Sequence, residues 1–208
     1  FTLEKAAAGA GRELVRNDPA TGKKEVLVPA QAFVPGGAKE PLAVDAYALS
    51  ADESRVLIST NSERVWRRDT RGDYWVLDVA TRKLRKLGGD ASPSSLMFAA
   101  FSPDGTPDGS QILVQQFNRL QTELKVWRAD PATGRATEVF TEKDAAWLEN
   151  ENPWRWLDGG KSFLWLSERS GWRHAYRARA DGSPPQPVTK GEFDVIAVEA
   201  VDEAGGWL

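Results

Sequence analysis

Three stretches of this chain repeat the same series of short apolar segments at an interval close to 52 residues. Ser50 and Ser102 lie 52 positions apart, as do Trp75 and Trp127, and Tyr176 follows Trp127 after 49. Each stretch contains four short segments of alternating apolar and polar residues with turn residues between them, which is typical of antiparallel strands. A repeat of about 40–50 residues with four strands is typical of a β-propeller blade.

The turns between these segments support the same interpretation. Asp-Gly pairs separate the apolar runs, and glycine supplies the positive φ that tight hairpin turns require. A second turn, Asp-Pro-Ala-Thr-Gly, occurs at both 18–22 and 130–134. A β-sandwich has similar hairpins, but sandwiches seldom repeat internally at a fixed period. We therefore predict an all-β fold, a partial β-propeller of four-stranded antiparallel blades.

The repeat also predicts how the chain is divided. The expected parts are the outer part of a blade at 1–40, whole blades at 44–90, 96–141 and 152–190, and the start of a next blade at 193–208. The equivalent inner strands are expected at Ala46–Ser50, Phe98–Ser102 and Trp154–Leu157. Natural propellers have about four to eight blades. Three whole blades do not close a ring, so we expect the missing blades in sequence not shown here.

Composition excludes several classes of function. Hydrophobic residues make up 41% and charged residues 27% of the chain, and no apolar run is long enough to predict a membrane span. The net charge of −3 is spread over the chain, so we expect no nucleic-acid partner. With no cysteine and one histidine, thiolate and zinc sites are not expected. Turn chemistry explains Asp104 and Asp108, so we predict no metal and no cofactor.

Three segments resemble one family. Ser162–His174 is similar to the family segment that ends in Ser-Glu-x-x-Gly-aromatic-Arg-His, and Gln111–Gln121 and Val65–Arg67 are similar to two further stretches. This family is the dipeptidyl-peptidase IV subgroup of prolyl-oligopeptidase-type serine peptidases, which remove dipeptides from peptide N-termini. The resemblance covers the chain from about Val44 to its end and is to the family's N-terminal β-propeller domain.

The chain departs from the family pattern near Gly105-Thr106, where two Pro-Asp-Gly turns stand almost side by side. Family members carry a long further stretch at this point, so we infer a deletion or missing residues. The paired glutamates with which the family binds the substrate's α-amino group lie in that interval. Glu149 and Glu151 are similar to them in type, but they precede an expected inner strand, and we expect a solvated acidic loop instead.

The resemblance implies a direct role for one residue, Arg67. The equivalent family arginine points into the central cavity and donates to a backbone carbonyl of the bound peptide. A guanidinium suits this role because it is always charged and holds several donors in a fixed fork. The alternative, an exposed loop arginine beside Arg64 and Arg68, remains open.

No catalytic residue is expected in this chain. No Gly-x-Ser-x-Gly motif occurs, and the single histidine, His174, begins a predicted strand. The resemblance places the catalytic triad in a C-terminal α/β-hydrolase domain that is absent here. It also implies a peptide substrate, that hydrolase domain as a partner, a homodimer, and a periplasmic or secreted location.

Two functions are consistent with the repeat and the resemblance. The first is a non-catalytic β-propeller segment of a dipeptidyl-peptidase IV-like serine aminopeptidase that gates and binds peptide. The second is a free-standing propeller-like module that binds proteins and has no peptidase. A Gly-x-Ser-x-Gly motif downstream in the gene would distinguish them. We expect the strand aromatics to pack between blades rather than to form a binding platform; they are Trp75, Trp127, Trp154, Trp156, Trp165 and Tyr176.

Overall fold

The computed structural model describes residues 1–7, 9–65, 68–102, 111–149 and 154–208. Within these ranges the chain is almost entirely antiparallel β-structure, with one short 3₁₀ turn, η1 (Ala30–Phe33). The predicted turn at Asp104-Gly105 and the inferred gap lie outside the described residues. The all-β prediction is confirmed.

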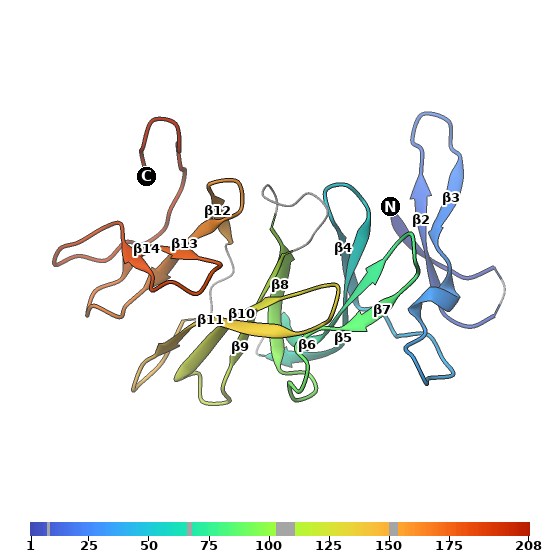
Figure 1. Cartoon of the computed structure of the whole chain (residues 1–208), viewed down its shortest axis with the longest axis horizontal. Helices are drawn as coiled ribbons and strands as arrows, with labels where there is room; N and C mark the ends of the chain where they lie inside the picture. Colours follow the sequence, from blue (N-terminus) through green and yellow to red (C-terminus); the bar gives the residue numbers. More distant parts are fainter. Residues whose placement is uncertain (8, 66–67, 103–110, 150–153) are drawn as a thin grey trace.

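The strands follow one another along the chain as hairpins (Figure 1). The first sheet contains β1 (Thr2–Lys5), β2 (Arg12–Asn17) and β3 (Lys24–Val28). The next two groups are β4 (Ala46–Leu49), β5 (Arg55–Val65), β6 (Arg68–Asp78) and β7 (Leu84–Lys86), then β8 (Leu96–Phe101), β9 (Ile112–Phe117), β10 (Glu123–Ala129) and β11 (Ala136–Lys143). The last sheet contains β12 (Arg155–Leu157), β13 (Ser162–Ser167), β14 (His174–Arg179) and β15 (Gln186–Pro187).

The second and third groups each pair in sequence order, as blades do, but they are not fully separate. β6 and β8 pair at Arg71 with Met97 and at Gly72 with Leu96, which joins β4 to β11 in one eight-stranded sheet. The strands β12 to β15 form their own four-stranded sheet. The sheets follow one another across Figure 1, with the two chain ends on opposite sides and no closed ring among the described residues.

Successive side chains of a strand point to opposite faces of its sheet, and the second and third groups have apolar residues on both faces. Val56 and Ile58 of β5 pack towards the first sheet, in a cluster with Leu14, whereas Leu57 between them packs on the other face with Ile112 of β9. The next residue of β9, Leu113, packs with Phe163 of the last sheet. Because residues i and i+2 share a face, the second and third groups each pack against the groups on both sides of them. This face-to-face stacking is how propeller blades bury their apolar residues.

Two local features differ from the expectation. The apolar alternation of the second strand in the 44–90 blade ends near Ser59, but β5 continues to Val65 and pairs with β6 from Arg68 onward, which makes a long hairpin. The segment Val195–Val201, within the expected start of a next blade at 193–208, forms no ladder with a neighbour in the described part of the chain. It is held instead by isolated bonds, including those from Arg155 Nη2 to the carbonyls of Val198 and Glu199.

Candidate functional site

The long β5–β6 hairpin carries the residue for which the sequence predicts a function. Its pairing shifts register on both sides of Glu63 and resumes until Val65 pairs with Arg68. The two residues that connect this last pair are Trp66 and Arg67, which lie outside the described residues. The role of Arg67 therefore stays a prediction.

A buried carboxylate fixes the bend of this hairpin. Asp73 is 3% exposed and accepts bonds from Asn61 Nδ2 (2.7 Å) and the Ser94 amide (3.2 Å), and its Oδ1 is 3.1 Å from Lys86 Nζ. Burial alone would raise the pKa of Asp73, but the hydrogen bonds from Asn61, Lys86 and Ser94 outweigh burial and hold it below its ordinary value. The bent part of β5 is thereby tied to β7 and to the loop before β8.

The backbone is close-packed at the same bend. A β-carbon on Gly72 would stand 2.9 Å from the carbonyl oxygen of Thr60, so any larger residue there would push the two strands apart. Thr60 in turn accepts a bond of 3.1 Å from Trp75 Nε1. The direction in which the hairpin leaves the sheet is therefore determined by Gly72 and Asp73, several residues before its end.

Beside the hairpin lies a hollow of about 430 Å³, which we call the arginine hollow. Its walls come from segments far apart in the sequence: the hairpin, β8, the end and turn of β9, and the loop after β11. The lining residues that matter here are Arg64, Arg71, Met97, Phe117, Arg119 and Trp147. None of its described lining residues carries a negative charge, so the hollow is a cationic cavity with apolar walls.

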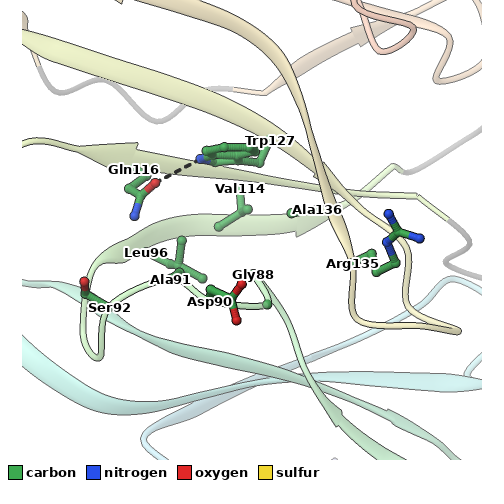
Figure 2. A pocket seen from close by; sticks show the side chains of 11 residues that line it. Gly88, Asp90, Ala91, Ser92, Leu96, Val114, Gln116, Trp127, Arg135 and Ala136 are labelled. Atoms are coloured by element: carbon green, nitrogen blue, oxygen red, sulfur yellow. Dashed lines mark hydrogen bonds between the residues drawn. The ribbon is translucent and has the colours of Figure 1, made fainter.

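A second hollow, of about 490 Å³, lies between the blade groups (Figure 2). Trp127 and Gln116 lie on one side of it and are joined by a bond of 3.1 Å from Trp127 Nε1 to Gln116 Oε1. The loop with Gly88 and Asp90 lies on the opposite side. This hollow contains both Asp90 and Arg135 and no excess of one charge among its described residues, so it is a weaker candidate for a charged ligand.

His174 is held as a structural residue. Its side chain is buried, with Nδ1 3.1 Å from Thr189 Oγ1 and Nε2 3.0 Å from the carbonyl oxygen of Gly191. A carbonyl only accepts, so Nε2 carries a hydrogen and donates it. Phe193 covers the ring edge to face at 5.3 Å. Both ring nitrogens of His174 are thus in hydrogen-bond contact with neighbouring residues of the fold.

Of the two glutamates expected in a solvated acidic loop, the structure describes only Glu149. Glu149 is exposed at the rim of a small hollow beside Leu148 and Trp165, and Glu151 lies outside the described residues. The described part of the chain contains no cluster of three or more histidine, cysteine or acidic residues that could hold a metal. No helix among the described residues is long and apolar enough to cross a membrane.

The strand aromatics pack mainly between sheets, as expected. Trp154, Trp156 and Trp165 surround Phe163 at ring distances of 5.3, 5.7 and 6.4 Å. Trp75 packs against the cluster between the first two groups. Trp127 differs, because it lines the hollow of Figure 2.

One known protein family matches about three quarters of this sequence. The model of the dipeptidyl peptidase IV N-terminal region matches residues 50–107 and 106–208. The chain belongs to this family. The two parts of the match to the dipeptidyl peptidase IV N-terminal region meet at residues 106–107, the place where the sequence departs from the family pattern.

Two curated relatives of this dipeptidyl peptidase IV N-terminal domain carry the names of dipeptidyl peptidases. A probable dipeptidyl peptidase 4 of Aspergillus flavus is 26% identical over 136 residues, which are 62% of this chain and 18% of the relative. A probable dipeptidyl-aminopeptidase B of Penicillium rubens is 30% identical over 149 residues, 66% of this chain and 16% of the relative. The chain spans less than a fifth of the length of these relatives.

Solved structures show the fold of this dipeptidyl peptidase IV N-terminal domain. Dipeptidyl peptidase 4 of Porphyromonas gingivalis superposes with a TM-score of 0.61 at 14% identity, over 96% of this chain and 35% of the other. An oligogalacturonate lyase in complex with manganese also superposes, with a TM-score of 0.54 at 15% identity over 90% of this chain and 44% of the other. Proteins with different activities share the fold, so the fold alone does not assign one.

The sequence does not predict the arginine hollow. It presents Arg64 only as a neighbour of Arg67, and it indicates no role for Arg71, Arg119 or Trp147. Arg119 does lie within Gln111–Gln121, one of the segments that resemble the family. No sequence signal connects that segment with the hairpin, because their contact depends on how β8 and β9 pack beside β6.

Proposed function

We propose that this chain is a non-catalytic β-propeller segment of a dipeptidyl-peptidase IV-like serine aminopeptidase, and that it gates and binds peptide substrate. Arg67 would donate to a backbone carbonyl of the peptide. The Ser, His and Asp of the reaction would belong to a C-terminal α/β-hydrolase domain. A homodimer and export from the cytoplasm are part of the same proposal.

The observation that carries this proposal is the match to the dipeptidyl peptidase IV N-terminal region from residue 50 to residue 208. The described geometry that supports it is the close packing at Gly72 and the buried Asp73, which hold strands β5 and β6 together. Substrate-binding groups act best when a rigid part of the fold supports them, because little freedom is then lost on binding.

The first test uses the natural protein that contains this chain. We expect its gene to encode a Gly-x-Ser-x-Gly motif downstream, and the complete protein to release chromophore from a Gly-Pro-anilide. The 208-residue chain alone should release none above blank. A gene without the motif and a complete protein without activity would favour the free-standing interaction module.

The second test is Arg67→Ala in that complete protein. A charge-assisted hydrogen bond in a partly desolvated cavity contributes about 1.5–3 kcal/mol. Its loss should lower kcat/KM roughly ten- to a hundredfold. Arg67→Lys should recover part of the loss, because an ammonium keeps the charge without the planar fork.

The matched control is Arg68→Ala, which should leave kcat/KM within about twofold of the wild type. If Arg68→Ala lowers activity while Arg67→Ala does not, the correspondence with the family is displaced by one residue. If neither variant changes activity, the chain serves as scaffold and Arg67 has no role in binding.

A further inference from the structure

The arginine hollow has an excess of positive charge. Arg64, Arg71 and Arg119 line it, and arginine is charged at every physiological pH. The recorded ion-pair partner of Arg71 is Glu63, whose Oε2 is 2.9 Å from Arg71 Nη2. Glu63 is itself 56% exposed, and an ion pair so open to water is weak. The hollow therefore favours an anion.

One residue that lines this hollow, Arg71, has a donor without a recorded acceptor. Arg71 uses Nη2 for Glu63, while its Nε is buried and has no hydrogen-bond partner among the described residues. A buried donor without an acceptor is unfavourable, and more so when it belongs to a charged group. A ligand that brings an acceptor oxygen to Arg71 would remove this cost.

Arg119 is presented on a rigid turn. Asn118 Oδ1 accepts from the amides of Thr122 (2.9 Å) and Glu123 (3.1 Å), and the carbonyl of Gln121 accepts from the amide of Leu148 (2.7 Å). The side chain of Arg119 is exposed and has no recorded partner among the described residues. A cation fixed in place by its own backbone loses little freedom when it binds a ligand.

The apolar walls indicate what kind of anion fits. Met97 is 1% and Phe117 9% exposed, whereas Trp147 is 49% exposed and its amide is held by Asp144 Oδ1 at 3.0 Å. Aromatic side chains and arginine together are enriched where proteins bind peptides and other proteins. A small inorganic ion would leave these walls unused, but the methylene groups of an acidic side chain would cover them.

We propose that the arginine hollow binds a carboxylate side chain of a peptide and so favours acidic peptides. The inference relies on the proposed function to explain why a peptide reaches this surface. Its test does not depend on that function. It assigns the electrostatic contacts to Arg71 and Arg119, and the apolar contact to Phe117 and Trp147. Arg67 would hold the peptide backbone, and the hollow would select the side chain.

The test measures equilibrium binding to the full chain by calorimetry at low salt. The probes are N-acetyl-Glu-Glu-amide and its neutral twin N-acetyl-Gln-Gln-amide. Both are blocked at the N-terminus, so neither is an aminopeptidase substrate. The acidic probe should bind at least about tenfold more tightly than the neutral one, and added salt should weaken it because the contacts are ionic.

Variants locate the binding site. Arg119→Gln should weaken the acidic probe about tenfold and leave the neutral probe unchanged, and Arg119→Lys should retain part of the affinity. Arg12→Gln is the matched control: this exposed arginine lies on β2 of the first sheet and has no recorded side-chain partner among the described residues. It should not change the affinity. All three variants should unfold at the wild-type temperature.

Three results would overturn the inference: equal binding of the two probes, no effect of Arg119→Gln, or displacement of the acidic probe by an equal concentration of inorganic phosphate. The last result would make the hollow a site for small anions. These outcomes are independent of the Arg67 test. Loss of activity in Arg67→Ala combined with equal probe binding would leave the proposed function standing and remove only the preference for acidic peptides.

Discussion

A β-carbon on Gly134 would overlap the carbonyl oxygen of Lys86, so the turn between β10 and β11 lies directly against β7 of the preceding blade group. Gly134 has φ +77°, and its amide closes the turn with a hydrogen bond of 2.7 Å to the carbonyl oxygen of Asp130. The first sheet repeats this turn at Asp18–Gly22, where Gly22 has φ +69° and open space around it. The same five residues thus form a contact between sheets in one place and a free turn in the other.

These two turns predict that the same glycine-to-alanine substitution lowers the unfolding free energy by different amounts at Gly22 and Gly134. Gly22→Ala should cost about 1 kcal/mol of unfolding free energy, because alanine is strained at positive φ. Gly134→Ala carries the same strain and also forces β7 and the turn apart, so we expect about 3 kcal/mol. Urea unfolding of both variants measures the difference. Equal losses would mean that the turn does not press on Lys86 in solution.

The turns also show what the sequence could predict. The Asp-Pro-Ala-Thr-Gly motif is visible twice, because glycine marks the positive φ. A third turn of the same form, Asp78–Arg82, cannot be recognised from the sequence. The Thr81 amide donates a hydrogen bond to Asp78 Oδ1 at 2.7 Å. The Arg82 amide donates to the Asp78 carbonyl at 2.9 Å, as the glycine amide does in the other two turns. Arg82 takes the glycine position with φ +60°. An arginine does not indicate positive φ, so the repeat predicts the strands on either side but not this turn.

The long hairpin and the arginine hollow could not be predicted for a different reason. Residues 60–64 and 68–73 are almost wholly polar, so no apolar alternation marks them as strands, although backbone ladder bonds need none. The hollow combines Arg71, Phe117, Arg119 and Trp147, which come from separate parts of the chain. A repeat predicts which residues are equivalent in different blades, but not which ones meet between blades.

The buried carboxylate of Asp73 is expected to stabilise the base of the hairpin. Asp73→Asn removes the charge that Lys86 faces and weakens the bonds from Asn61 and Ser94, so we expect a loss of about 2 kcal/mol. Asp144→Asn is the control, since the bonds recorded for the Asp144 side chain are to the exposed amides of Ala146 and Trp147. Denaturant unfolding should show a much smaller effect there. Equal effects would contradict the role given to Asp73.

The lowered pKa of Asp73 also predicts a pH dependence. A carboxyl whose pKa is lower in the folded than in the unfolded chain contributes stability above its unfolded value, near pH 4. That contribution is lost as the pH falls through the folded pKa. The difference in melting temperature between wild type and Asp73→Asn should therefore be largest above about pH 5 and shrink below about pH 4. A difference that stays constant down to about pH 2 would show that the charge of Asp73 contributes nothing.

Glu142 is expected to hold the last sheet against β11. It is 6% exposed and accepts from Ser167 Oγ at 3.0 Å and from Arg169 Nη2. Glu142→Gln leaves Arg169 without its counter-charge, so the unfolding free energy should fall by about 2–3 kcal/mol. Glu138→Gln on the same strand, an exposed residue 3.9 Å from Lys125 Nζ, should change it by less than about 0.5 kcal/mol. Similar losses in the two variants would contradict a buried link at Glu142.

The inner strands β8 and β12 are joined through a tryptophan. Trp154 Nε1 donates at 2.9 Å to the carbonyl of Phe98, a residue with φ +49°, and its ring packs edge to face on Phe163 at 5.3 Å. Trp154→Phe keeps an aromatic ring but removes this donor and some volume, so we expect the unfolding free energy to fall by about 2 kcal/mol.

Trp156→Phe is the matched control, because Trp156 packs on the same Phe163 at 5.7 Å without a recorded hydrogen bond in the described part of the chain. It should lose only the volume contribution, about 1 kcal/mol. Unfolding followed by tryptophan fluorescence compares the two. If Trp156→Phe is as destabilising as Trp154→Phe, the bond to Phe98 adds no stability, and the two inner strands are held by packing alone.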